Sequence, residues 1–235
     1  MNDDKIVIDI ATVRHLIATQ FPEWRDLPIF PVDYSGWDNK TFHLGESMLI
    51  RMPSALSYAS QVKKEQQWLP KLAPLLPLPI SVPLAMGKPS NDYPWKWSIY
   101  EWLEGDTAVT GYIADLCDFA TSLGQFLIAL HRIDMKDGPL AGLHSFYRGG
   151  SLANYDSEAR KAIIALKGKI DTDAATQIWE KALATTWKNP KVWVHGDISA
   201  GNLIVKWKTF GVIDFGQLAV GTAGSSCPND APGVP

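Results

Sequence analysis

Three polar side chains near the carboxyl end have the types and the spacing that phosphoryl transfer requires. Asp197 ends a His-Gly-Asp sequence, Asn202 follows it by five residues, and Asp214 begins an Asp-Phe-Gly sequence. Transfer of a phosphoryl group needs a carboxylate that accepts the proton of the attacking hydroxyl, and hard oxygen ligands for magnesium. We therefore predict that Asp197 is the catalytic base and that Asn202 and Asp214 are metal ligands.

Short apolar segments flank these residues and are predicted to hold them in place. Residues 192–194, 203–205 and 212–213 each have the composition of a short strand, so that each polar group comes at the end of a strand. The alternative interpretation is that these are turn residues between strands, with His195 a buried core histidine.

The stretch around Asp197 resembles the aminoglycoside phosphotransferase family, small-molecule kinases with a protein-kinase-like fold whose catalytic loop carries His-Gly-Asp. The resemblance covers about residues 8–221. Beyond the catalytic stretch it is carried by five segments: Gly36-Trp37-Asp38-Asn39, Leu49-Ile50-Arg51-Met52-Pro53, Glu65-Gln66-Gln67-Trp68-Leu69-Pro70, Pro94-Trp95-Lys96-Trp97-Ser98-Ile99-Tyr100 and Phe146-Tyr147-Arg148-Gly149-Gly150.

The resemblance implies an α+β, two-lobed protein-kinase-like fold. Residues 1–102 would form a nucleotide-binding N-lobe with an antiparallel sheet plus helices, and residues 103–106 a hinge. Residues 107–221 would form a mainly helical C-lobe with the catalytic loop and the metal site. It further implies Mg²⁺ as cofactor, ATP or GTP as phosphate donor, and a small hydroxyl-bearing acceptor.

A basic residue and a helix carboxylate in the first lobe are candidates for gripping the phosphates. Residues 41–44 and 48–52 are predicted to form a hairpin, and 57–69 a helix. Arg51 on the second strand would contact phosphates and pair with Glu65 on the helix. Arginine stands where such folds carry lysine, so the contacts differ in detail. The alternative is a surface arginine at a strand end.

The remaining nucleotide contacts are expected at a turn and at the hinge. Gly36 is interpreted as a turn that approaches phosphate. Residues 97–102 change from a strand pattern to turn signals, and adenine would bind backbone groups there, with Tyr100 and Trp102 in the site. Trp95, Trp97 and Trp102 are more typical of aromatic residues that pack a core face than of a base-stacking platform.

Apolar spacings of three and four predict further helices. Asp9 is a candidate cap for a helix that ends at Phe21. A buried helix is predicted to run from Ile113 to about His131, which we interpret as structural, and another over residues 174–187. The adjacent Lys63 and Lys64 are interpreted as a solvated helix face.

Beyond Gly221 the resemblance stops, and residues 222–235 are rich in Gly, Ser and Pro. We expect them to form a disordered tail. The chain then has the pattern of a family member truncated or frameshifted after Gly221, whose C-lobe lacks its C-terminal helices. The apolar C-lobe surface left uncovered is expected to promote self-association.

Composition agrees with a globular enzyme, since 46% of the 235 residues are hydrophobic and 20% are charged. The net charge of −3 argues against nucleic acid or an anionic membrane as partner and is compatible with a cationic acceptor. The first residues lack a signal-peptide pattern, so we expect a cytoplasmic protein. Cys117 and Cys227 suggest neither a disulfide framework nor a metal site.

Three hypotheses for function follow. The first is an active small-molecule phosphotransferase that uses magnesium and a nucleoside triphosphate. The second is a truncated, catalytically impaired relative that binds nucleotide and transfers nothing, and the third is a scaffold. The joint presence of Asp197, Asn202 and Asp214 argues against the scaffold. The choices between ATP and GTP, and among aminoglycosides, macrolides and other hydroxyl compounds, stay open.

Overall fold

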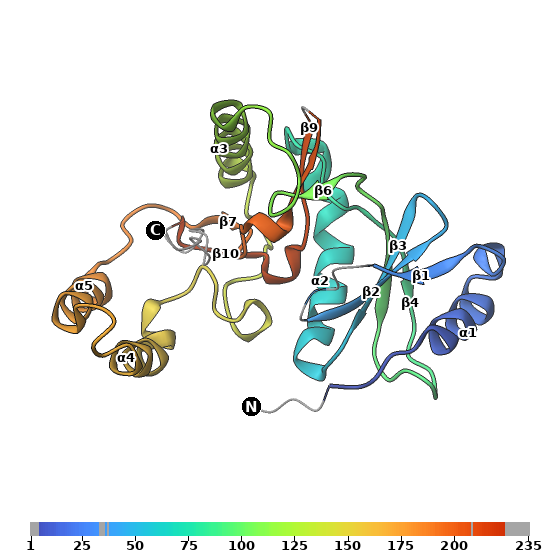
Figure 1. Cartoon of the computed structure of the whole chain (residues 1–235), viewed down its shortest axis with the longest axis horizontal. Helices are drawn as coiled ribbons and strands as arrows, with labels where there is room; N and C mark the ends of the chain where they lie inside the picture. The colour runs from blue at the N-terminus through green and yellow to red at the C-terminus, as the bar shows by residue number, and fades with distance from the viewer. Residues whose placement is uncertain (1–4, 33–35, 37, 208, 224–235) are drawn as a thin grey trace.

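The protein has two lobes joined around one long helix (Figure 1). The computed structural model describes residues 5–32, 36, 38–207 and 209–223. The first lobe is built on a five-stranded antiparallel sheet in the order β1-β2-β3-β5-β4. Its strands are β1 (Ile29–Pro31), β2 (Asn39–Leu44), β3 (Met48–Pro53), β4 (Pro83–Gly87) and β5 (Trp97–Glu101).

Helix α1 (Ile10–Gln20) covers one part of this sheet, as the sequence predicts. The side chain of Asp9 caps it by accepting a hydrogen bond of 2.7 Å from the Thr12 N–H, which satisfies one of the free donors of the first turn. Val13, Leu16 and Ile17 are buried in the N-lobe core together with Trp97. The core interpretation of that tryptophan is therefore confirmed.

Helix α2 (Leu56–Leu72) runs between the lobes and contributes to the core of the second one (Figure 1). Trp68 and Leu69 pack with residues of the C-terminal lobe. The prediction of a solvated Lys63-Lys64 face is wrong for Lys64, whose side chain is buried, while Lys63 is exposed. The reason is that α2 is covered on a second side by the loop that carries Asp214, which sequence periodicity cannot reveal.

The second lobe combines three helices with two small sheets. β10 pairs with β7 in one sheet, and the other has the order β6-β8-β9. The helices are α3 (Leu116–Arg132), α4 (Asp156–Ala165) and α5 (Thr172–Ala184), and the strands are β6 (Asp106–Thr107), β7 (Val192–Val194), β8 (Leu203–Lys206), β9 (Thr209–Val212) and β10 (Ala219–Gly221). Short 3-10 helices are η1 (Pro22–Trp24), η2 (Ala73–Leu75), η3 (Leu143–Ser145), η4 (Leu152–Tyr155), η5 (Ala200–Asn202) and η6 (Phe215–Gln217).

Helix α3 begins later and is less buried than its apolar pattern predicts. Asp115 caps it, leaving Ile113 outside the helix. Phe126 and Leu130 are buried, whereas Leu116 at the start of the helix is exposed. The expectation of a buried helix is thus wrong for its first turns, because an apolar stripe shows which face can be buried and not whether a neighbour covers it.

The limits of several other elements also differ from those predicted. Helix α5 ends at Ala184, so the predicted extension to 187 is wrong, and α4 was not predicted. Asp106, expected in the hinge, already pairs with Val205 of β8. Thr222, expected in the tail, donates its N–H to the Gly149 carbonyl at 2.8 Å. The rest of the predicted tail from residue 224 lies outside the described residues.

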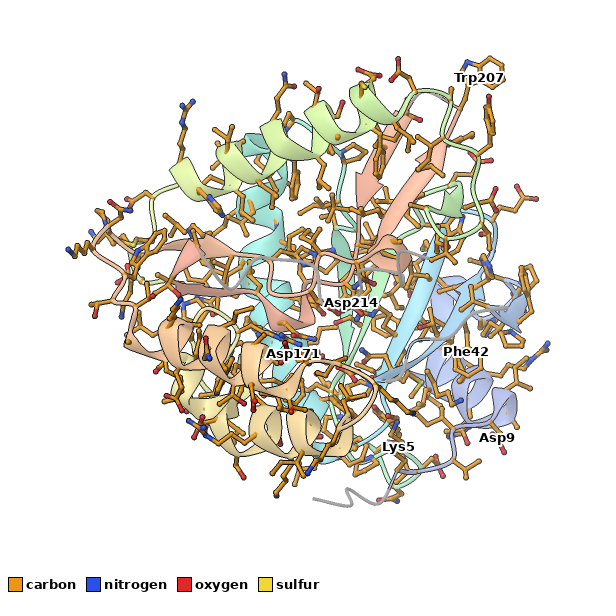
Figure 2. The ribbon with its side chains drawn as sticks, turned by 60° about the vertical axis from the view of Figure 1, so that its left-hand side comes forward. Lys5, Asp9, Phe42, Asp171, Trp207 and Asp214 are labelled. Carbon is orange, nitrogen blue, oxygen red and sulfur yellow. The ribbon has the colours of Figure 1, made fainter. Side chains whose placement is uncertain are left out.

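The turn between β8 and β9 forms without the usual Asn-Gly or Asp-Gly pair. Trp207 takes a left-handed conformation there, with φ of 58°, and projects outward while Asp214 lies deep between the lobes (Figure 2). A non-glycine residue in this region is strained. Among the described residues, no helix is both long and apolar enough to cross a membrane.

Candidate active site

The catalytic loop is anchored by a fully buried histidine between β7 and β8. Nε2 of His195 donates to the Ile213 carbonyl at 3.0 Å, and Nδ1 accepts from the Asp197 N–H at 3.2 Å. Burial lowers the pKa of His195 to about 4, so the ring is neutral near pH 7 and keeps this donor and acceptor arrangement. His195 is thus a core histidine, as the alternative held, and it also positions Asp197.

Gly196 is required by the shape of the loop. Its φ is +89°, and an added Cβ would lie 2.7 Å from the Gln217 carbonyl oxygen. Glycine adopts this conformation without strain and leaves room for the last residue of η6. The His-Gly-Asp sequence therefore has a steric basis at its middle position.

Asn202 and Asp197 are directly hydrogen-bonded. The Asn202 amide Nδ2 donates to the Asp197 backbone oxygen at 2.9 Å and to its carboxylate Oδ2 at 3.1 Å. These two bonds fix the carboxylate and direct the amide oxygen of Asn202 away from it. The Ile213 N–H donates to the Asn202 carbonyl at 3.0 Å, which brings the neighbouring Asp214 to the same site.

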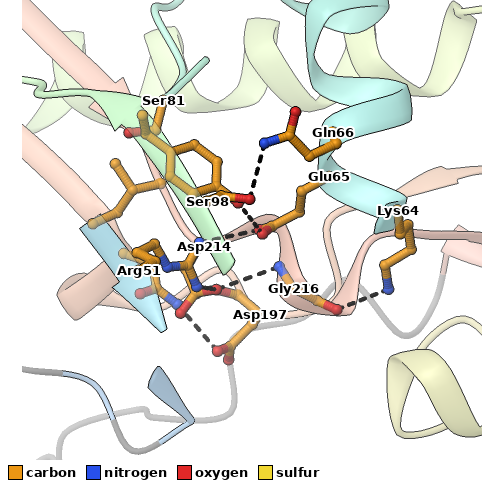
Figure 3. A network of polar contacts seen from close by, with 12 residues as sticks. Arg51, Lys64, Glu65, Gln66, Ser81, Ser98, Asp197, Asp214 and Gly216 are labelled. Atoms are coloured by element: carbon orange, nitrogen blue, oxygen red, sulfur yellow. Dashed lines mark hydrogen bonds and ion pairs between the residues drawn. The ribbon is translucent and has the colours of Figure 1, made fainter. Parts of the chain in front are cut away.

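Arg51 joins the two lobes at this site (Figure 3). Its Nη1 lies 3.1 Å from Glu65 Oε1 on α2, and its Nη2 lies 2.6 Å from Asp214 Oδ1. The Arg51 side chain is only 13% exposed, so the surface-arginine alternative is wrong. Burial alone would raise the pKa of Asp214, but the guanidinium outweighs this effect and holds that pKa below its usual range.

The other predicted nucleotide contacts lie at different places. Tyr100 is buried behind the ion pair, where its hydroxyl donates to Glu65 Oε2 at 2.5 Å. Its side chain therefore supports Glu65 and does not face the site. Trp102 is partly buried and packs against His43 in a tilted arrangement, with ring centroids 4.3 Å apart. Gly36 is exposed with no neighbour near an added Cβ, so its approach to phosphate stays a prediction.

Two residues near the site were missed by sequence reasoning. Asp38 lies close enough to Asp214 and Asp197 that burial, followed by the charge of Asp214, raises its pKa. Sequence reasoning considered the segment from Gly36 to Asn39 because of Gly36, and it did not consider the carboxylate of Asp38. Lys64 was missed because a lysine beside another lysine on a helix usually faces water.

The donor set fits magnesium. Asn202 supplies an amide oxygen and Asp214 a carboxylate whose side chain is 33% exposed, and both are hard oxygen ligands. In the described part of the chain, no group of three His, Cys, Asp or Glu side chains could hold a metal by itself. Mg²⁺ binds proteins through one or two carboxylates plus substrate phosphates and water, and Asp214 supplies such a carboxylate.

Comparison with known proteins identifies the architecture. The model of the phosphotransferase enzyme family matches residues 31–224. The chain resembles the GDP complex of wild-type aminoglycoside 2'-phosphotransferase-IIIa with a TM-score of 0.70 and 18% identity, over 92% of this chain and 75% of that one. No curated protein sequence matches it.

Two further solved structures show the same fold. The ternary complex of streptomycin, ATP and APH(2")-IIa has a TM-score of 0.60 and 22% identity, over 94% of this chain and 75% of that one. The apoenzyme of macrolide 2'-phosphotransferase MphH from Brachybacterium faecium has a TM-score of 0.62 and 20% identity, over 92% of this chain and 75% of that one. The two lobes thus form the protein-kinase-like fold of these enzymes.

Proposed function

Because the chain belongs to the phosphotransferase enzyme family, we propose that it moves the γ-phosphate of a nucleoside triphosphate to a hydroxyl group of an aminoglycoside-like small molecule. The family makes it a small-molecule O-phosphotransferase. The observation that carries the proposal is the convergence of Asp197, Asn202 and Asp214 with Arg51 from the other lobe. In this proposal the four residues supply a base, metal ligands and a phosphate-binding cation at one site.

Each residue has a defined task in this proposal. Asp197, held by Asn202, accepts the proton of the attacking hydroxyl. Arg51, kept in place by Glu65, binds phosphate oxygens of the donor. Asn202 and Asp214 hold magnesium, which neutralises charge that develops on the phosphates. Catalysis is then chiefly positioning and electrostatic stabilisation.

The donor and acceptor classes are inferred from similar proteins. GDP and kanamycin are bound in one similar structure, and ATP with streptomycin in another. We propose either ATP or GTP as donor. Aminoglycosides are polycations, and the net charge of −3 of this chain is compatible with such an acceptor. Use of a nucleoside triphosphate agrees with a cytoplasmic location, which we also propose.

The deciding experiment measures acceptor-stimulated phosphate transfer. ATP and GTP are each offered with aminoglycosides and macrolides, to the parent and to Asp197→Asn. We expect transfer to one acceptor class by the parent and a loss of at least about a thousandfold in kcat for the variant, with nucleotide binding retained. Equal rates in both proteins would remove Asp197 from the base role. If the parent binds nucleotide but transfers phosphate to no acceptor, the result would favour the alternative hypothesis of a catalytically impaired protein that only binds nucleotide.

A further inference from the structure

The ammonium of Lys64 on α2 is buried, and each of its three N–H donors has an acceptor. Nζ lies 2.8 Å from the Gly216 carbonyl oxygen, 2.9 Å from the His144 carbonyl oxygen and 3.0 Å from His144 Nδ1. A buried charge is costly unless it is fully hydrogen-bonded, and this set meets that condition. The lysine therefore ties α2 to two separate segments of the C-terminal lobe.

The state of His144 is consistent with an acceptor role toward Lys64. Its Nε2 lies 2.8 Å from the Leu140 carbonyl oxygen, an acceptor, so Nε2 carries the proton and Nδ1 has the lone pair. Burial, and then the charge of Lys64, lower the pKa of His144, which keeps the ring neutral near pH 7. Burial also lowers the pKa of Lys64, to about 8, so that most of it stays charged at pH 7.

The residue that Lys64 holds through its carbonyl oxygen also faces Asp214 through its N–H. The Gly216 N–H points to Asp214 Oδ1 at 3.3 Å, while the Gly216 carbonyl accepts from Lys64. Helix α2 packs closely here, since a Cβ on Gly216 would lie 2.6 Å from Gln61 Oε1. Asp214 itself has a left-handed backbone with φ of 61°. Such a conformation persists only where the surroundings hold it.

Two consecutive residues of α2 thus act on Asp214 from two sides (Figure 3). Glu65 acts through Arg51, which binds the Asp214 carboxylate directly. Lys64 acts through Gly216, whose N–H faces the same carboxylate oxygen. Adjacent helix positions point about 100° apart, so one helix reaches both the cation and the loop.

We propose that Lys64 is a positioning residue that holds the backbone of Gly216, and through it the magnesium ligand Asp214, in place. Nothing in the transfer reaction requires Lys64 to touch a substrate. The inference rests on the proposed function in one respect, which is the role of Asp214 as a metal ligand. It adds that the position of this ligand depends on α2 through a lysine as well as through the Arg51–Glu65 pair.

The test is the magnesium dependence of nucleotide binding, which needs no acceptor and no turnover. Binding of a non-hydrolysable ATP or GTP analogue is measured by calorimetry over a range of Mg²⁺ concentrations. Lys64→Met removes the charge and the donors at similar length. We expect the half-saturating Mg²⁺ concentration to rise about tenfold or more, with metal-free nucleotide affinity changed by less than about twofold. Lys63→Met, at the exposed neighbour, is the matched control and is expected to behave as the parent.

Each result decides the inference. A Lys64→Met protein that is less stable but keeps the parental magnesium dependence would show that Lys64 only stabilises the fold. If that variant does not fold, His144→Ala removes one acceptor of the tether, and we expect a smaller shift of about threefold in the same direction; an unchanged dependence overturns the inference. A parent that binds nucleotide with magnesium but never transfers phosphate defeats the proposed function alone. A parent without any magnesium dependence defeats the role of Asp214 and this inference with it.

Discussion

Arg51 is the residue at which the charges of both lobes meet. Its guanidinium bridges Glu65 and Asp214, and the two carboxylates raise the pKa of Arg51 against the opposing effect of burial. Two N–H groups in a rigid planar fork serve two carboxylates at once, which a lysine ammonium on a flexible stem does less well. Arginine at this position therefore gives a fixed bridge between α2 and the loop that carries Asp214.

We expect Arg51→Lys to weaken nucleotide binding by about tenfold, because one of the two ion pairs is lost and the cation is held less firmly. The measurement is a fluorescence titration with nucleotide in the presence of magnesium. Arg160→Lys is the matched control, since Arg160 also bridges two carboxylates, Asp156 and Glu180, but at the surface. Equal nucleotide affinity for Arg51→Lys and the parent would contradict the bridging role.

His195 makes stability depend on pH. The unfolded chain takes up a proton near the ordinary pKa of 6.5, whereas the folded protein does so only near 4. Between these values the unfolded state binds more protons, so the free energy of unfolding falls as the pH is lowered, by up to roughly 3 kcal/mol for this group.

We expect this loss to be smaller in His195→Gln than in the parent. Urea unfolding at pH 7.5 and at pH 5 measures it, and the exposed His15→Gln serves as control with the parental pH dependence. Parallel losses in parent and His195→Gln would show that other groups dominate the acid sensitivity.

At the scale of elements, the catalytic loop is shaped by the close approach of two chain segments. The loop after β7 and the 3-10 helix η6 come so near at Gly196 that no side chain fits. A glycine inside a helix differs from Gly196, because the helix requires no special backbone conformation of it. Gly124 of α3 has no atom within 4 Å of an added Cβ and no positive φ.

These two glycines give opposite predictions for the same substitution. Gly196→Ala should lower the free energy of unfolding by about 1–3 kcal/mol, because of the contact with the Gln217 oxygen and the strained backbone. Gly124→Ala should raise it by about 0.5–1 kcal/mol, since alanine favours the helix. Urea denaturation of both variants measures the difference. A Gly196→Ala protein as stable as the parent would show that the loop relaxes freely.

At the scale of the whole molecule, the C-terminal lobe carries exposed apolar side chains on helices α4 and α5. This helix pair lies apart from the first lobe (Figure 1). Ile164 of α4 is 71% exposed and Ile178 of α5 is 68% exposed. Exposed apolar surface favours association in water. The self-association expected for the C-lobe surface stays a prediction.

We expect the protein to self-associate at concentrations of about tens of micromolar, and Ile164→Lys combined with Ile178→Lys to suppress this association. Sedimentation velocity over a concentration series measures the change. Val109→Lys is the control, because Val109 is comparably exposed but lies beside β6, outside this helix pair. The helix surface has no special role in association if the parent sediments as a monomer at every concentration. The same holds if Val109→Lys suppresses association as strongly as the double Ile164→Lys, Ile178→Lys variant does.

The grouping of the central residues could be predicted from the sequence because they lie close together along the chain. Asp197 and Asn202 lie between β7 and β8, and Asp214 follows β9, so local spacing already implies that they meet. Periodicity likewise predicted α1, α2 and most of the strands of the first lobe. These features depend on contacts between near neighbours, which a linear pattern records.

The tertiary structure alone decided how the site is held. Arg51 and Asp214 are 163 residues apart, and Lys64 reaches Gly216 across 152 residues. The sequence indicated Arg51 and Glu65 but gave no sign of the bond to Asp214, and it placed Lys64 in water. Burial of a polar side chain depends on which distant segment covers it and offers acceptors. No local pattern of residues contains that information, because only the folded chain brings those partners within hydrogen-bonding distance.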